Sequence, residues 1–138
     1  MGTSLIRPGT AEDLRAIGRV QSDEWRLEDY LAYQIDVAEV DGEIVAFLVT
    51  RRLAEDEAEV LNIAVSEAHR RQGLASRLLQ TAFDRWPGRW FLEVRASNLG
   101  AQICYQNLGF RRIGVRPGYY PTKNGKSAEE GIVMEKGK

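Results

Sequence analysis

Cysteine and histidine, which commonly build reactive or metal sites, occur only once each in the 138 residues of this sequence. A single cysteine cannot form a disulfide within the chain and fits a reducing compartment, so we expect a cytoplasmic protein. One thiol and one imidazole are too few ligands for a typical zinc site, so we expect no metal. Neither residue is predicted to be catalytic, since Cys104 lies on the apolar stripe of a predicted helix and His69 is expected to be exposed.

The sequence also lacks long apolar runs and an excess of charge of one sign. No run approaches the roughly 20 apolar residues of a membrane-spanning helix, and we expect no signal peptide at the start. The 19 basic and 20 acidic side chains leave a net charge of −1, which argues against a dedicated nucleic-acid-binding protein. We therefore expect residues 1–138 to form one domain without a membrane or direct nucleic-acid partner.

The apolar pattern predicts an α/β protein with elements in the order β-α-α-β-β-β-α-β-α-β-β. The pair Asp41-Gly42 indicates a hairpin turn between two strands. Residues 51–57 and 117–127, which are rich in charged or turn-forming residues, are predicted to be connections, and the final strand is predicted over residues 132–135. Most strands are expected to pair antiparallel in one sheet.

Residues 61–79 have the pattern of a buried strand, a short loop and a helix. The strand pattern ends at Val65, and from Leu74 onward apolar residues recur every three or four positions. The first turn of a helix has backbone N–H groups without intrahelical partners and lies at the positive end of the helix dipole. Gly73 would let an anion reach that backbone, and Arg71 adds positive charge. The stretch predicts a pyrophosphate site, although a solvated surface loop has the same pattern.

Five short segments occur in an order and spacing that match a known family. They are Asn62–Val65 (NIAV), Arg70–Ala75 (RRQGLA), Leu92–Asn98 (LEVRASN), Tyr105–Phe110 (YQNLGF) and Tyr119–Thr122 (YYPT). With these segments the chain resembles the GNAT superfamily of acetyl-CoA-dependent N-acetyltransferases, and within it the bacterial ribosomal-protein-alanine N-acetyltransferases. In the first 60 residues the match is weak, because the family's Pro-Trp-Ser is reduced to Trp25 between Glu24 and Arg26.

The resemblance implies a GNAT fold, with a mostly antiparallel central sheet of about seven strands flanked by helices. It implies acetyl-CoA as co-substrate and direct transfer of the acetyl group to an amine in a ternary complex. The acceptor implied first is the α-amine at a protein N-terminus, for instance that of a ribosomal protein. Two alternatives stay open: a GNAT enzyme for a small amine or a lysine side chain, and a non-catalytic module that binds acyl-CoA.

The resemblance also implies roles for individual residues. Glu93 matches the family's general base and Tyr105 its general acid, and Val65 is the candidate donor to the thioester oxygen. The residues implied to bind the cofactor are Ile63, Ala64, Val65, Arg71, Gln72, Gly73, Leu74, Ala75, Ser76 and Asn98, and those implied to bind the acceptor are Trp25, Tyr119 and Tyr120.

Most of these residues also have a plain structural interpretation. Glu93 could be a solvated strand residue, Tyr105 a core side chain and Asn98 a helix N-cap. Twelve residues separate Glu93 from Tyr105, which places them on an adjacent strand and helix that could line one cleft. A β-bulge in the strand that ends at Val65 would separate it from the strand of Glu93 and open a slot for the cofactor. The joint presence of a base and an acid argues against a pure binding module.

Overall fold

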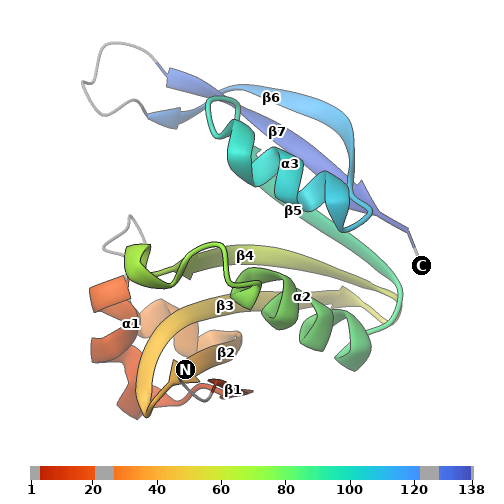
Figure 1. Ribbon diagram of the computed structural model, residues 1–138. Coiled ribbons are helices and arrows are strands. Elements are labelled where there is room, and N and C mark those ends of the chain that lie inside the picture. The colour runs from red at the N-terminus through yellow and green to blue at the C-terminus, as the bar shows by residue number, and fades with distance from the viewer. Residues whose placement is uncertain (1–3, 21–26, 122–127, 138) are drawn as a thin grey trace.

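A seven-stranded sheet with the strand order β1-β2-β3-β4-β5-β7-β6 forms the centre of the protein (Figure 1). The computed structural model describes residues 4–20, 27–121 and 128–137. All neighbouring strands pair antiparallel except β4 and β5, which are parallel. The predicted fold class and order of elements are confirmed. The strands are β1 (Ser4–Pro8), β2 (Gln34–Val40), β3 (Glu43–Ala54), β4 (Glu57–Val65), β5 (Arg89–Arg95), β6 (Arg111–Pro121) and β7 (Ala128–Lys136).

Helices cover both faces of this sheet and enclose two hydrophobic clusters. One cluster, with Ile17 and Phe47, lies on the face covered by α1 and η2, and the other, with Leu78 and Leu92, lies on the face covered by α2 and α3. Each face of the central strands is therefore buried, which explains their nearly continuous apolar sequences. The helices are η1 (Ala11–Asp13), α1 (Leu14–Val20), η2 (Leu27–Ala32), η3 (Glu67–His69), α2 (Leu74–Arg85) and α3 (Leu99–Asn107), where η marks a 3-10 helix.

The hairpin between β3 and β4 is longer than the sequence pattern predicts. β3 continues to Ala54 and β4 begins at Glu57, so the prediction of a connection over residues 51–57 is wrong. Residues 51–56 are all exposed, and a strand without a buried face lacks the apolar alternation by which strands are predicted. An ion pair between Arg51 and Glu59, which face each other across the two strands, supports this end of the hairpin.

The last two strands are also longer than predicted. β6 continues to Pro121 and β7 begins at Ala128, so the prediction of a loop over residues 117–127 is wrong for its first part. Residues 122–127 lie outside the described residues. The ladder between β6 and β7 is irregular between Arg116 and Tyr120, because the segment contains a proline, which cannot donate to a ladder, and a glycine.

β4 and β5 separate soon after they begin, and this separation is the feature that positions the site. They pair only at Glu57–Arg89, Ala58–Trp90 and Glu59–Phe91. The register of β4 against β3 skips Leu61, so the predicted β-bulge is present, and a bulge bends and twists its strand. Beyond Glu59 the sheet divides into two halves (Figure 1). We call this division the fork.

A glycine holds the closed end of the fork together. The Arg89 N–H donates to the carbonyl oxygen of Asp56 over 2.8 Å. Gly88 has a φ of 144°, and a Cβ at this position would lie 2.3 Å from that same oxygen. Because any side chain would collide with the backbone here, the start of the β4–β5 pairing requires glycine.

Candidate active site

The fork leaves one edge of β4 without a strand partner. Residues 62–65 pair with β3, but no strand in the described part of the chain pairs with them on the side that faces β5. Backbone N–H and C=O groups on such an edge can bond to an extended ligand. The predicted cofactor segment Ile63–Val65 therefore lies along the fork with no strand on that side, and of its main-chain groups the Val65 carbonyl oxygen already accepts a hydrogen bond from Arg70 Nε.

The turn before α2 presents bare backbone to open space. Arg71 and Gly73 adopt φ angles of 65° and 78°, and both are exposed. The Arg77 N–H donates to the carbonyl oxygen of Gly73 over 3.0 Å, so the N–H groups of Leu74–Ser76 precede the hydrogen-bonded ladder of the helix. Apart from its two chain neighbours, no described residue has a heavy atom within 4 Å of a Cβ built on Gly73. The predicted residues Arg71–Ser76 are thus brought together in a form that can bind an anion.

Two side-chain hydrogen bonds hold the loop between β4 and α2. Arg70 Nε donates to the carbonyl oxygen of Val65 over 3.0 Å, and Ser66 Oγ is hydrogen-bonded to His69 Nδ1 over 2.9 Å. His69 is half-buried, so the prediction that it is exposed is wrong. Both bonds fix the amino end of α2 close to the end of β4, where the predicted cofactor segments meet.

Glu93 lies on the face of β5 opposite the larger cluster. Its neighbours Leu92 and Val94 are buried in the cluster under α2 and α3, and strand alternation turns Glu93 to the other face. Its side chain is 20% exposed, and its Oε1 lies 3.5 Å from Nε of Arg116. Burial raises the pKa of Glu93 above its ordinary value, Arg116 lowers it, and Glu59 raises it again. A carboxylate with a raised pKa accepts a proton more readily near neutral pH.

Tyr105 lies in α3 and packs into the cluster on the other face. It is 8% exposed, and its ring meets that of Phe110 edge-on with centroids 5.8 Å apart. Because the same cluster contains Leu92 and Val94, Tyr105 and Glu93 lie on opposite faces of β5. The core interpretation of Tyr105 is therefore correct. A substrate that contacts both Tyr105 and Glu93 would have to lie in the fork, where the two faces of the sheet are connected.

Asn98 has the structural role that its position before α3 predicts, whereas Cys104, predicted to be buried on the apolar stripe of α3, is only half-buried. The Asn98 side chain accepts a hydrogen bond from the Ala101 N–H over 3.1 Å, which is an N-cap. Cys104 is half-buried, and burial raises the pKa of its thiol. A thiol that resists ionisation is a poor nucleophile. The cap uses one acceptor of Asn98, and its predicted contact with the cofactor stays a prediction.

The three residues predicted to bind the acceptor are only partly located. Trp25 lies outside the described residues. Tyr119 and Tyr120 belong to β6, where the main chain of Tyr120 pairs with Glu129, so their predicted place in a loop is wrong. The three acceptor contacts stay predictions.

The structure adds four residues to the face of Glu93 that sequence reasoning assigned no individual role. Asn62 Nδ2 donates to Tyr30 Oη over 2.6 Å, which ties β4, just beyond its bulge, to η2. Glu59 and Arg116 act on Glu93 through their charges. Asn62 lies in the NIAV motif, which is a signal in the sequence, whereas Glu59 and Arg116 approach Glu93 only through strand register.

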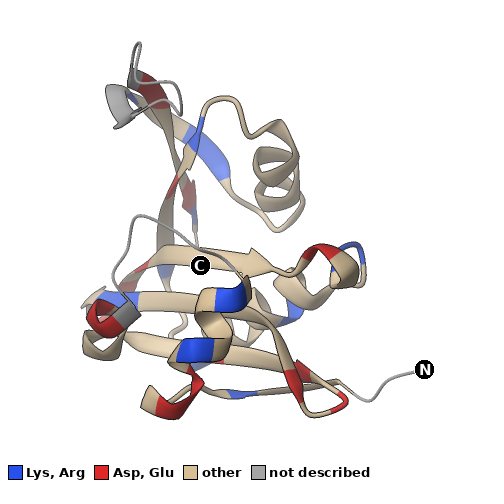
Figure 2. Cartoon of the chain, turned by 90° about the vertical axis from the view of Figure 1, so that its left-hand side faces the viewer, with Lys and Arg blue, Asp and Glu red and all other residues tan. Residues whose placement is uncertain are grey.

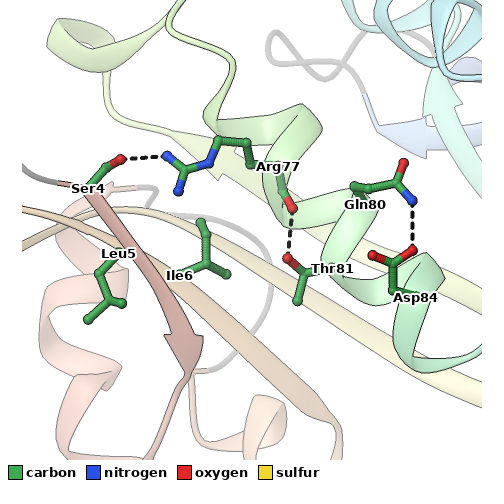
Figure 3. Close-up of a pocket in the computed structure, with 7 residues that line it drawn as sticks. All are labelled: Ser4, Leu5, Ile6, Arg77, Gln80, Thr81 and Asp84. Atoms are coloured by element: carbon green, nitrogen blue, oxygen red, sulfur yellow. Dashed lines mark hydrogen bonds between the residues drawn. The ribbon is translucent and has the colours of Figure 1, made fainter.

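A hollow lies between β1 and α2 and contains none of the residues predicted for the site (Figure 3). Arg77 Nη1 donates to Ser4 Oγ across it over 2.5 Å, and Gln80 Nε2 donates to Asp84 Oδ1 over 2.9 Å. Thr81 Oγ1 donates to the main-chain carbonyl oxygen of Arg77 over 2.9 Å, and the Arg77 side-chain contact with Ser4 holds α2 against the edge strand. The lining residues are Ser4, Leu5, Ile6, Arg77, Gln80, Thr81 and Asp84.

Basic and acidic positions both occur on several of the described elements (Figure 2). Within the described ranges, no three His, Cys, Asp or Glu side chains are grouped so that they could hold a metal ion. No helix in these ranges has the length and apolar character needed to cross a membrane.

Comparisons with known proteins agree with this geometry. Residues 6–110 match the family model of the Acetyltransferase (GNAT) family. A [ribosomal protein bS18]-alanine N-acetyltransferase of Escherichia coli K12 is 40% identical over 111 residues, which cover 78% of this chain and 71% of the relative. An N-alpha-acetyltransferase of Sulfurisphaera tokodaii is 35% identical over 100 residues, covering 61% of this chain and 60% of the relative. The crystal structure of the ribosomal-protein-S18-alanine N-acetyltransferase from Escherichia coli superposes with a TM-score of 0.88 at 30% identity, covering 98% of this chain and 94% of the other.

Proposed function

Because the chain belongs to the acetyltransferase (GNAT) family, we propose that it transfers the acetyl group of acetyl-CoA to the N-terminal α-amine of a protein, as one domain acting in the cytoplasm. The acceptor class follows the names of its relatives, which are an alanine N-acetyltransferase of ribosomal protein bS18 in Escherichia coli and an N-alpha-acetyltransferase in Sulfurisphaera tokodaii. The observation that carries the proposal is the fork. The amino end of α2, which is suited to an anion, follows its β4 arm, and the carboxylate of Glu93 lies on its β5 arm.

The α2 end of the fork suits acetyl-CoA. The diphosphate would rest on the N–H groups of Leu74–Ser76, with Arg71 adjacent, because these groups lie at the positive end of the helix. The extended acyl-bearing arm would then run along the free edge of β4, where Ile63–Val65 offer main-chain partners. The Val65 N–H would donate to the thioester oxygen as negative charge develops on it.

The two faces of β5 would supply the two proton transfers. Glu93 would take a proton from the acceptor ammonium, directly or through water, and the neutral amine would attack the thioester carbonyl. The new C–N bond forms and the C–S bond breaks, and the Tyr105 hydroxyl would give its proton to the departing thiolate. The nitrogen would release its second proton to solvent, and solvent would return a proton to the Tyr105 phenolate. The fork allows the acceptor to approach from the face of Glu93 while the thioester approaches from the face of Tyr105.

The phosphate site can be tested by reversing the charge of Arg71. We expect Arg71→Glu to weaken acetyl-CoA binding about tenfold at low salt, since it replaces a cation next to the diphosphate by an anion. Isothermal titration calorimetry at two salt concentrations would measure the change and its screening. Arg19→Glu, an exposed charge reversal in α1 on the other face of the sheet, is the matched control. Equal acetyl-CoA affinities of the two variants would contradict the assigned site.

The acceptor class can be tested with a panel of amines. Peptides with free N-termini, the same peptides with blocked N-termini and one internal lysine, polyamines and free lysine would be incubated with acetyl-CoA. We expect acetylation of the free α-amines alone, with mass spectrometry locating the acetyl group. Transfer confined to small amines or to the lysine side chain would overturn the N-terminal assignment and favour the alternative acceptor.

A further inference from the structure

The strand register brings a cation to Glu93 from β6, across the intervening strand β7. Gly131 of β7 is paired with Arg95 on one side and with Arg116 on the other, while Glu93 is paired with Val133. Arg116 and Glu93 therefore lie on the same face of the sheet, at diagonal positions. Gly131 has no side chain to lie between them, and Nε of Arg116 reaches to 3.5 Å from the Glu93 carboxylate.

An anion approaches Glu93 from the opposite direction, on β4. Glu59 is paired with Phe91, the last residue of β5 that pairs with β4, and Glu93 follows two positions later on the same face. The Glu59 carboxylate is itself held by Arg51 of β3. The carboxylates of Glu59 and Glu93 thus lie on β4 and β5, the two strands that separate at the fork. Glu59 is paired with Arg51 and Glu93 with Arg116, and each arginine lies on the side away from the other carboxylate.

Two further arginines of β5, Arg89 and Arg95, form ion pairs with other residues. Arg95, its neighbour on the same face of β5, forms an ion pair with Glu129 of β7 over 3.4 Å. Arg89 forms ion pairs with Glu135 and Glu57. Among the described residues, Arg116 lowers the pKa of Glu93 and Glu59 raises it, in addition to the effect of burial.

We propose that Arg116 and Glu59 are positioning residues for the transfer reaction: Arg116 holds the Glu93 carboxylate from the side of β6, and Glu59 places a like charge on the side of β4. This inference rests on the proposed function, in which Glu93 accepts the proton of the acceptor amine. Arg116 favours the charged carboxylate and Glu59 favours the protonated one. With Arg116 the half-buried Glu93 stays ionised, as a base must be, and with Glu59 it keeps a sufficient tendency to take a proton.

Two neutral substitutions should move the titration of Glu93 in opposite directions. Arg116→Gln removes the cation and should raise the pKa of Glu93, whereas Glu59→Gln removes the anion and should lower it, each by about half a pH unit to one unit for partly exposed charges. Because the charged form of Glu93 is the base, the acid limb of kcat should move to higher pH in Arg116→Gln and to lower pH in Glu59→Gln. Carbon NMR of the glutamate carboxyl groups would report the titration without any turnover.

Two control variants distinguish this role from a merely structural one. Arg116→Lys keeps the charge and should restore the wild-type limb. Arg112→Gln changes the net charge equally, but Arg112 is paired with Met134 and faces the other side of the sheet, so it should leave the limb unchanged. Thermal unfolding would confirm that each variant is folded.

The outcomes separate this inference from the proposed function. If Arg116→Gln and Glu59→Gln leave the Glu93 titration unmoved, or shift it in the same direction, the positioning roles are refuted even where peptide acetylation is intact. If the wild-type protein acetylates no peptide N-terminus, the proposed function fails, and the titration of Glu93 in the NMR experiment still decides whether the two residues act on it.

Discussion

Replacing Glu93 with glutamine should lower kcat for acetyl transfer by about 100-fold or more, because an amide cannot take the proton of the acceptor ammonium. Acetyl-CoA should bind to the variant as it does to the wild type, since Glu93 lies on the face of β5 that is turned away from α2 and α3. Steady-state kinetics with a peptide acceptor would give kcat, and calorimetry would give the affinity for acetyl-CoA.

Glu43→Gln offers a matched control for this substitution. Glu43 begins β3 and is exposed, so the same loss of one carboxylate should leave both transfer and binding unchanged. Retention of full activity in Glu93→Gln would remove Glu93 from the reaction. Loss of acetyl-CoA binding would show that the carboxylate is needed for the structure of the site rather than for proton transfer.

Replacing Tyr105 with phenylalanine should also lower kcat by about 100-fold, because the thiolate would leave without the proton of the phenol. Stability should stay close to that of the wild type, since the ring keeps its contact with Phe110 and its place in the core cluster. Tyr105→Ala, by contrast, should lower the free energy of unfolding by about 3 kcal/mol through loss of the buried ring. Kinetics and urea unfolding of both variants would separate the hydroxyl from the ring.

The leaving group provides a specific test of the acid role. If the acetyl donor has a more acidic thiol, its thiolate needs less protonation when it departs. The reduction of kcat in Tyr105→Phe should therefore be smaller with such a donor. A deficit that is the same for both donors would contradict proton donation by Tyr105 and would favour a role in positioning the acyl arm.

Much of the site could be predicted because its parts are local in sequence. The turn before α2 depends on a glycine followed by a helical apolar stripe, and the structure places Gly73 and Leu74 accordingly. Asn98 caps α3 through the Ala101 N–H three residues away. Contacts between residues a few positions apart depend on the local sequence, so apolar periodicity and helix-capping preferences predict them.

Predictions failed where a strand has no buried face or where its backbone is irregular. The exposed end of the β3–β4 hairpin and the first part of the segment 117–127 were predicted to be connections, and both are strand. In each case the strand is recognised by cross-strand pairing, as between Arg51 and Glu59 or between Tyr120 and Glu129, rather than by apolar alternation.

The sequence by itself determined the α/β order of the elements and the turn at Gly73 before α2, because each of these depends on side chains within a few positions of one another. The expected roles of Glu93 and Tyr105 came from the resemblance to a family. The tertiary structure alone decided that Glu93 and Tyr105 lie on opposite faces of β5 and that Arg116 and Glu59 meet Glu93 from two other strands. Strand register decides these contacts, and a shift of one residue would turn each side chain to the other face.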